Sequence, residues 1–487
     1  MTTEPSAGRA GLLSPRAIAG CLLAALLLCW PMLLVTAPLA YYDSYAYASA
    51  GRTALASLLD ALPLPDPPAP TGGGAGGGAA AAAEDDGGGT GVLRSAPWSL
   101  AIAMLGGMPR GAIALCILQT AATLLMLRAV IPAGALIGPA LWVPAAIAVG
   151  LLTGLPWYAA YAMPDILGAL VIGYYAALAM PAGLPGRAAQ WVFAALAAFA
   201  IAAHYGHLPL AAGLAAVAAL LRIRHLTLGR VALLAGPVVA AVLANLAVSV
   251  AVERMTPPPP VQAQAGAAAA PAPSAMPSAT PRRLPILLGR AIEDGPGLWH
   301  LREACLRDAY ATCDLFDEIP PTASAFLWGD EGIRSLSAGE LAVLRGEEME
   351  IVIGATRAYP LEQAAAFGRN VALQLARVGV DQVLPAPPPP ARRSADIDPV
   401  LAVADRVVPV VTGLAALWLL WRTLSGRLDP ALRAPLAILV AALAANALVY
   451  GGLSYPVDRY QGRLAWLIPA LLALDLVIGR RTRRALA

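Results

Sequence analysis

The sequence predicts an all-α, polytopic membrane protein of about ten transmembrane helices, with a small, mainly helical extracytoplasmic domain inserted between spans 7 and 8. Composition predicts the class: 59% of the 487 residues are hydrophobic and 13% are charged, whereas soluble domains carry about 25% charged residues. A mean hydropathy of +0.67 agrees with this class and excludes a disordered chain. The net charge of +3 gives no reason to expect nucleic-acid binding.

The spans are apolar runs close to the roughly 20 residues that cross a bilayer core about 30 Å thick. Ten runs are found, at 17–40, 110–130, 135–154, 164–182, 187–204, 208–222, 230–252, 405–423, 433–453 and 463–480. The run at 208–222 is the shortest, so the count is about ten. The stretch from Trp98 to Met108 is too short to span and is expected at the interface or re-entering.

The arginines set the orientation, because cytoplasmic loops retain basic residues. With the N-terminus inside, fourteen arginines fall on the cytoplasmic side and five on the opposite side, apart from the one large loop. Both termini are then cytoplasmic, including the basic tail at 480–484. A cleaved signal peptide ending near Ala40 is the alternative, although its 24-residue core is longer than the usual roughly 7–15 residues.

Three regions follow from these spans. Residues 1–252 form an N-terminal membrane domain of about seven spans, with a flexible Gly/Ala-rich outer loop near 67–90. Residues 253–404 form the extracytoplasmic region, where Pro/Ala-rich tethers flank a folded unit at 284–384. Residues 405–487 form a C-terminal membrane domain with three spans and the basic cytoplasmic tail.

The unit at 284–384 is expected to be helical and acidic. Ser337 and Glu340 form a capping-box pattern, and Pro360 suits the first turn of a helix running to about Val378. Fifteen acidic residues face eight arginines here, which suits a solvated surface, and a protein partner through this unit is the alternative. Cys305 and Cys313 are expected to form a disulfide on the oxidising side.

Two acidic residues near predicted span ends are candidates for catalysis, because ionisable groups at a membrane boundary are expensive to keep there. Asp43 follows span 1 in a tyrosine-rich segment that continues to Arg52, and it could serve as a general base or simply cap a surface helix. Asp165 follows Pro164 at the start of span 4, where an ordinary helix N-terminus is the plain alternative.

Arginines and histidines complete the candidate site. Arg459 and Arg463 precede the last span, where they could bind a lipid phosphate or anchor the helix to headgroups. His204 and His207, three residues apart, could line an acceptor site, although interfacial hydrogen bonding is the plainer interpretation. No third metal ligand lies near them, so no metal site is predicted.

Together, two outward-facing carboxylates and an arginine pair could move a sugar off a lipid phosphate. The arginines would hold the departing phosphate while a carboxylate deprotonates the acceptor hydroxyl. The absence of a P-loop or a dinucleotide-binding fingerprint in the sequence agrees with a donor that carries no nucleotide.

At these residues the sequence resembles the C-type glycosyltransferase superfamily. The resemblance rests on Asp43 in YYDSYAYASAGR, Asp165 in AMPDILGALVIGYY, RYQGRLAWLIP before the last span, and RSAPWSLAIAMLGG at 94–107. It implies a bacterial inner-membrane enzyme that uses a polyprenyl-phosphate-linked sugar donor. Asp43 and Asp165 would be catalytic, and Arg459 and Arg463 would bind the lipid phosphate. Arg52 is a further candidate for binding the lipid phosphate, and Tyr42 and Trp157 are candidates for the acceptor site together with the two histidines.

One departure from that family bears on cofactors. Many members carry two adjacent acids in the first outer loop, where this chain has Asp43 followed by Ser44. A divalent metal is therefore in doubt, and no cofactor is assigned. The alternatives to an enzyme are a secondary transporter or lipid flippase, for which no inverted repeat is found, and a non-catalytic assembly or sensor protein that uses 284–384.

Overall fold

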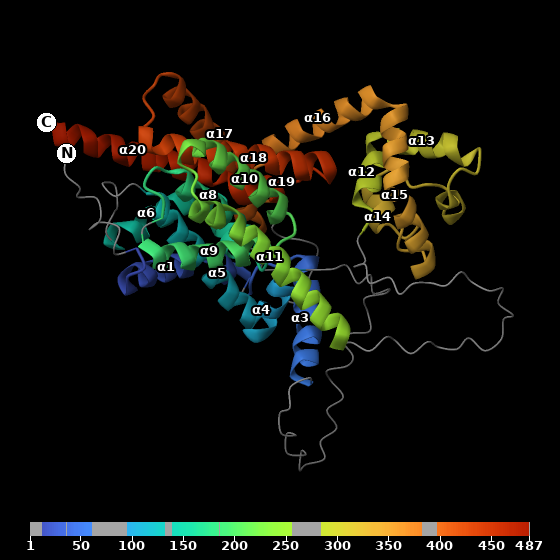
Figure 1. Cartoon of the computed structure of the whole chain (residues 1–487), viewed down its shortest axis with the longest axis horizontal. Helices are drawn as coiled ribbons and strands as arrows, with labels where there is room; N and C mark the ends of the chain where they lie inside the picture. Colours follow the sequence, from blue (N-terminus) through green and yellow to red (C-terminus); the bar gives the residue numbers. More distant parts are fainter. Residues whose placement is uncertain are drawn as a thin grey trace, which may run out of the picture. The chain divides into compact units, whose positions relative to one another are not determined.

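The computed structural model describes residues 12–35, 37–60, 95–131, 139–184, 186–255, 284–381 and 397–486. Most of these residues are helical (Figure 1). Among them, one isolated β-bridge joins Leu39 to Tyr161. The Gly/Ala-rich loop near 67–90 and the two proline runs of the tethers lie outside the described residues.

The chain forms two compact units. The first, called the membrane unit, comprises Met1–Leu55, Arg94–Ser249 and Phe367–Ala487, so the predicted N- and C-terminal membrane segments pack together. The second comprises Ala56–Leu93 and Val250–Ala366. The boundary falls within a helix, α16 (Pro360–Ala376), so residues expected to close the inserted unit belong to the membrane unit instead.

The membrane unit is a helical bundle. Its helices up to residue 255 are α1 (Pro15–Leu28), α2 (Pro31–Val35), α3 (Tyr42–Asp60), α4 (Ala96–Met104), α5 (Arg110–Val130), α6 (Pro139–Leu151), α7 (Leu155–Ala159), α8 (Leu167–Ala179), α9 (Gly186–Ala202), α10 (His207–Leu221) and α11 (Leu228–Met255). Those after the insertion are α17 (Ile397–Leu424), α18 (Arg433–Ala447), α19 (Asp458–Ala465) and α20 (Leu467–Leu486). Short 3-10 turns join several of them, including η2 (Pro164–Ile166).

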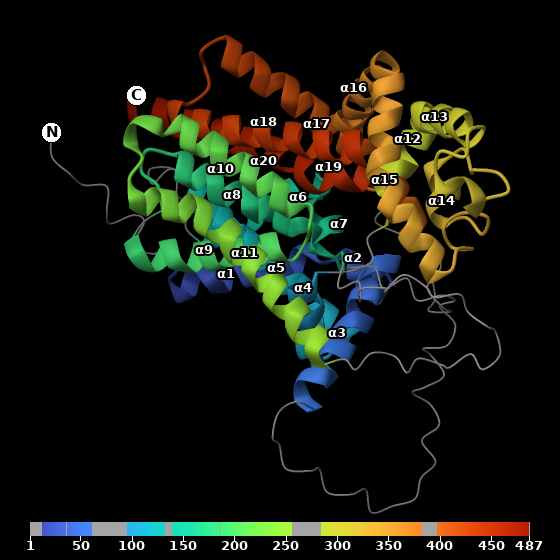
Figure 2. The same ribbon diagram turned by 45° about the vertical axis from the view of Figure 1, so that its right-hand side comes forward.

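The core of the bundle is α8, which packs against α5, α9, α10 and α18 (Figure 2). All residues from 153 to 177 are buried, from the turn before α7 through most of α8. Helix starts follow their sequence signals: Ser14 accepts a hydrogen bond from the Ala17 amide at α1, and Ser95 accepts one from the Trp98 amide at α4, with proline in the first turn of each helix.

Among the described residues, five helical stretches are long and apolar enough to cross a membrane: Arg110–Val130, Leu228–Val248, Ile397–Leu424, Pro430–Gly452 and Asp458–Gly479. Four shorter apolar helices accompany them: Pro15–Leu28, Pro164–Ala179, Gly186–Ala202 and His207–Leu221. These helices support a multi-span membrane protein. The count of ten spans and the orientation of the termini remain expectations from the sequence.

The second unit has its own small core. It contains α12 (Ile286–Asp294), α13 (Pro296–Cys305), α14 (Ala323–Trp328), α15 (Ala338–Ala358) and the start of α16. Leu288, Phe326, Leu344 and Ile351 are fully buried in that core. The Ser337–Glu340 capping box opens α15, where each side chain bonds the backbone amide of the other residue. Cys305 and Cys313 form a disulfide.

Candidate functional site

The site begins with an irregular segment inside the bundle. Residues 160–163 are buried but not helical, a form of backbone that membrane proteins tolerate only when protein surrounds it. Their polar groups are paired across the fold: the Leu39 amide donates to the Ala160 carbonyl at 2.9 Å, and the Ala162 amide donates to the Leu39 carbonyl at 2.7 Å. This pairing ties the chain just before Asp43 to the chain just before Asp165.

Side chains of α5 hold the same segment from the other side. The amide nitrogen of Gln119 donates to the carbonyls of Tyr161 and Met163 at 3.3 and 3.2 Å. The Cys116 thiol lies 3.3 Å from the Tyr161 carbonyl. Because its carbonyls are bonded in this way, the segment delivers Asp165 into the bundle at η2 in a fixed position.

Two arginines from α19 meet that carboxylate. Arg459 Nε lies 3.2 Å and Arg463 Nη1 lies 3.3 Å from the same oxygen, Asp165 Oδ1. The two arginines are four residues apart, which places them on one face of the helix. A second carboxylate approaches from α3, where Asp43 Oδ2 lies 3.9 Å from Arg459 Nη2. The four charged side chains therefore form one cluster, in which Arg459 contacts both carboxylates.

The two carboxylates differ in their exposure to solvent. The side chains of Asp165 and Arg463 are 0% exposed and that of Arg459 is 7% exposed, whereas the Asp43 side chain is 23% exposed. Buried charges are tolerated when they are paired and hydrogen-bonded, so Asp165 and the arginines stabilise one another's charged forms. Asp43 is the carboxylate of this cluster with access to solvent or to a ligand.

Tyrosine rings surround the guanidinium groups. Arg459 lies over Tyr41 at 4.8 Å, and Arg463 lies over Tyr450 at 4.7 Å, both measured to the ring centroid. Tyr161 and Tyr460 lie within 5.8 Å of Arg459. These cation–π contacts hold both side chains in place in a setting with little water.

Polar groups at the end of α18 complete the support of Arg463. Its Nη2 donates to Asn446 Oδ1 at 3.2 Å, and Asn446 in turn donates to Gln461 Oε1 at 2.7 Å. Directly after Asn446 the helix widens into a π-helical turn, Leu448–Gly452, which carries Tyr450. Such turns occur often at functional sites.

Gln119 Oε1 and the Tyr161 hydroxyl are buried in this region without a hydrogen bond to any residue that the structure describes. The same is true of two further acceptors, Asp165 Oδ2 and His207 Nε2. The His207 ring is oriented because its Nδ1 lies 2.8 Å from the Ala200 carbonyl, which can only accept, so Nδ1 carries the proton. An acceptor buried without a donor is costly, so both atoms favour a bound water or a hydroxyl group of a ligand.

The remaining sequence candidates differ in where the structure places them. His204 joins the cluster: its ring lies 4.9 Å from that of His207, and its Nδ1 lies 3.3 Å from the Tyr450 hydroxyl. Trp157 instead packs edge-on against Trp30 at 5.7 Å, as part of the core. Arg52 is exposed on α3, nine residues beyond Asp43 and so about 13 Å farther along the helix. The side chain of Tyr42 lies outside the described part of the structure.

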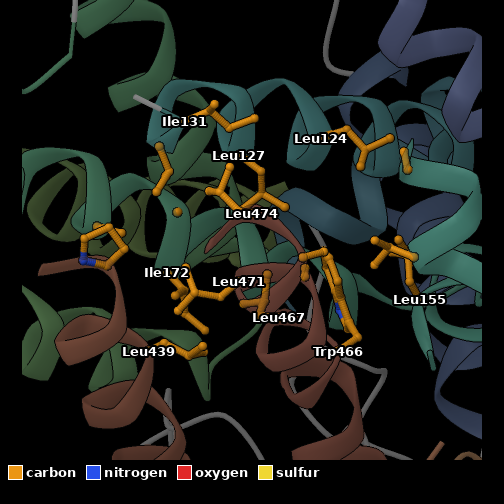
Figure 3. Close-up of a pocket in the computed structure, with 18 of the residues that line it drawn as sticks. Leu124, Leu127, Ile131, Leu155, Ile172, Leu439, Trp466, Leu467, Leu471 and Leu474 are labelled. Atoms are coloured by element: carbon orange, nitrogen blue, oxygen red, sulfur yellow. The ribbon is translucent and has the colours of Figure 1, made fainter. Parts of the chain in front are cut away.

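An apolar cavity of about 170 Å³ lies within the same unit (Figure 3). Its walls come from α5, α6, α8, α18 and α20, with Leu155 and Trp466 at one end and Ile131 at the other. Trp466 connects it to the charged cluster, because its indole N–H donates to the Arg463 carbonyl at 2.9 Å. Its apolar walls suit an apolar ligand.

Several residues of the site carry weak sequence signals. Gln119 and Asn446 are amides within apolar helices, where a polar side chain marks a functional candidate by default. Tyr41, Tyr161, Tyr450 and Tyr460 carry no such signal, because tyrosine is expected at membrane boundaries anyway. No group of three or more His, Cys, Asp or Glu side chains in the described ranges is arranged to hold a metal ion.

The chain was compared with family models, with curated proteins and with solved structures, and none of these comparisons found a match. The interpretation of the site therefore rests on its geometry and on the sequence resemblance given above.

Proposed function

We propose that the chain is an integral membrane glycosyltransferase that moves a sugar from a polyprenyl-phosphate donor to an acceptor at the extracytoplasmic face. The observation that carries the proposal is the gathering of Asp43, Asp165, Arg459 and Arg463 from three separate parts of the chain. The apolar cavity lined by Trp466 supports an amphiphilic substrate, which has a phosphate to bind and a hydrocarbon chain to bury.

Arg459 is the proposed phosphate ligand. Its contact with Asp43 is 3.9 Å long, beyond the 2.7–2.9 Å of a charge-assisted hydrogen bond, so an incoming phosphate oxygen can replace Asp43 at little cost. Arg463 is as buried as Asp165, so it contributes a second positive charge one turn away and not a direct contact. Asp165 has no solvent access, so its proposed role is to hold both arginines in place and not to react with the substrate.

Asp43 is the proposed general base. The bond between the anomeric carbon and the phosphate oxygen breaks, and the electron pair leaves with the polyprenyl phosphate, whose charge Arg459 and Arg463 stabilise. The acceptor hydroxyl oxygen forms the new bond to the anomeric carbon, and its proton passes to Asp43. The partial exposure of Asp43 allows an acceptor to approach it.

Sugar transfer in nanodiscs tests this function. Purified protein is supplied with a panel of polyprenyl-phosphate sugars, and release of sugar from the lipid is measured. Asp43→Asn is expected to lower the rate by about 10²–10⁴-fold, the usual contribution of a general base. Asp330→Asn, at an exposed site in the second unit, is the matched control and is expected to keep the wild-type rate. Equal rates for the two variants would contradict the role of Asp43.

The cavity also favours a second candidate, a lipid flippase, because such a protein binds the same phosphate and the same chain. The two functions differ in the role of Asp43. A flippase would move a fluorescent polyprenyl-phosphate analogue between leaflets in proteoliposomes without releasing sugar, and Asp43→Asn would leave that movement intact.

A further inference from the structure

Residues 374–381, called the strap here, comprise the last turn of α16 and the chain that follows it. Two carboxylates bind its backbone amides. Asp458 Oδ1 accepts from the Gly379 amide at 2.9 Å, and Asp405 Oδ1 accepts from the amides of Val380 and Asp381 at 2.7 and 3.1 Å. Asp405 lies on α17 and Asp458 is the first residue of α19, so the strap links these two helices.

The strap is also bonded to the loop before α19. Gln374 Nε2 donates to the Val457 carbonyl at 2.8 Å, and the Val457 amide donates back to Gln374 Oε1 at 3.0 Å. The Gln374 side chain is buried although it is polar, because these two bonds satisfy it. Residues 457 and 458, immediately before Arg459, are therefore fixed by the strap.

Tyr158 extends this contact to the middle of α19. Its hydroxyl donates to the Gly379 carbonyl at 3.1 Å. A side chain at Gly462 would collide with both the Tyr158 hydroxyl and the Gly379 carbonyl, so α19 approaches the strap closely at this residue. Gly462 directly precedes Arg463 and lies one turn after Arg459, so the strap contacts the helix between its two arginines.

Gly379 is where the fit is tightest. A Cβ atom there would collide with the carboxylate of Asp405 and would lie 3.1 Å from Asp458 Oδ1. Val380 then inserts into the bundle, where it is 0% exposed and would lie 3.2 Å from a Cβ atom placed at Gly154, before α7. Asp458, Tyr158 and the close approach at Gly462 thus attach this short segment to the helix that carries the arginines, and Asp405 attaches it to α17.

We propose that the strap sets the position of Arg459 and Arg463 for binding a lipid phosphate, with Asp458, Tyr158 and Gly379 as positioning residues. This inference rests on the proposed function and adds a determinant of affinity that lies outside the charged cluster. Loss of strap contacts frees the start of α19 to shift, and a displacement of about 1 Å at a binding group can cost about 100-fold in rate.

The test compares two glycine substitutions in one segment of chain. Gly379→Ala displaces the Asp405 carboxylate that binds the strap and crowds Asp458 Oδ1, whereas Gly368→Ala changes α16 at a position with nothing within 4 Å of the added methyl group. Binding of farnesyl phosphate to the full chain in detergent is measured together with hydrogen–deuterium exchange of residues 457–464. Gly379→Ala is expected to weaken binding by about 10- to 100-fold and to speed exchange in those residues. Gly368→Ala is expected to change neither.

Two further variants keep the test informative if Gly379→Ala folds poorly. Asp458→Asn retains an oxygen that accepts from the Gly379 amide, so it is expected to keep most of the affinity that Asp458→Ala loses. Faster exchange with unchanged binding in Gly379→Ala and Asp458→Ala would overturn the strap proposal and leave the proposed function intact. Wild-type protein that binds farnesyl phosphate no better than Arg459→Gln would contradict the proposed function, and this inference would fall with it.

Discussion

Arg459 Nε lies 3.2 Å from Asp165 Oδ1, although 294 residues separate them in the chain. Arg463 reaches the same oxygen, and Asp43 approaches Arg459 from a third element. Neither arginine is more than 7% exposed, so the contact is internal and not a surface ion pair of small energetic value.

The stability of the membrane unit is expected to depend on Asp165. Asp165→Ala leaves two buried guanidinium groups without their shared partner, and removing one partner of a buried pair costs about 3–5 kcal/mol. Unfolding in SDS, followed by tryptophan fluorescence, measures the loss against Asp330→Asn. A change below about 1 kcal/mol would show that the arginines find other partners.

Lysine is not expected to replace Arg459. The guanidinium group lies over the Tyr41 ring and bonds Asp165 through Nε, and an ammonium group offers neither planar stacking nor that second donor position. Arg459→Lys should therefore lose at least about tenfold in affinity for farnesyl phosphate despite its retained charge. Arg187→Lys, on the exposed side of α9, provides the control. Wild-type affinity in Arg459→Lys would mean that charge alone suffices.

Filling the cavity is expected to discriminate between ligands by chain length. Ala470→Phe places a ring among the lining residues of α20 and should weaken binding of a long polyprenyl phosphate while sparing inorganic phosphate. Ala216→Phe, exposed on α10, adds the same ring elsewhere. Equal affinity of both variants for the long-chain ligand would show that the cavity does not hold the lipid chain.

The second unit should lose stability in acid through Glu347. This carboxylate accepts hydrogen bonds from the Ala311 amide, the Thr312 amide and the Thr312 hydroxyl at 3.0, 2.9 and 2.6 Å. Partial burial acts to raise the pKa of Glu347, but the bonds from Thr312 and Ala311 outweigh it and hold the pKa below its ordinary value. The stabilisation is therefore complete above the unfolded pKa of about 4.3 and is lost as the pH falls through the lower folded value.

That acid dependence can be measured as hydrogen–deuterium exchange of residues 305–315 between neutral pH and pH 3, after correction for intrinsic exchange. Glu347→Gln should show faster exchange at neutral pH and a smaller change on acidification than the wild-type protein. Identical pH profiles for the two proteins would exclude Glu347 as the titrating group.

The sequence predicted where the helices lie better than it predicted how they contact one another. Each of the ten apolar runs contains a helix, and the Ser337–Glu340 capping box is present. These features could be predicted because they depend only on residues close together in the sequence. The segment at 160–163 could not be foreseen as a buried, non-helical element, because its hydrogen bonds come from Leu39 and Gln119, far away in sequence.

The attachment of the strap to the membrane unit was not predicted, for a related reason. Residues 367–381 were expected to close the inserted unit, because α16 is one continuous helix and nothing in its sequence marks residue 366 as a boundary. Its attachment depends on Asp405 and Asp458, whose contacts with the strap are made between residues far apart in sequence. Arg52 is only nine residues from Asp43 in the sequence. Because both lie on one helix, α3, those nine residues place Arg52 about 13 Å farther along the helix axis.

The central claim, that Arg459 binds the phosphate of a lipid donor, is tested most directly by solid-state NMR. Dipolar coupling is measured between the phosphorus of a polyprenyl phosphate and isotope-labelled arginine nitrogens, in the wild-type protein and in Arg459→Gln. We predict a coupling that corresponds to hydrogen-bonded contact, about 2.7–2.9 Å from nitrogen to oxygen, and its loss in the variant. A lipid phosphate that couples to no arginine, or equally in both proteins, would contradict the account.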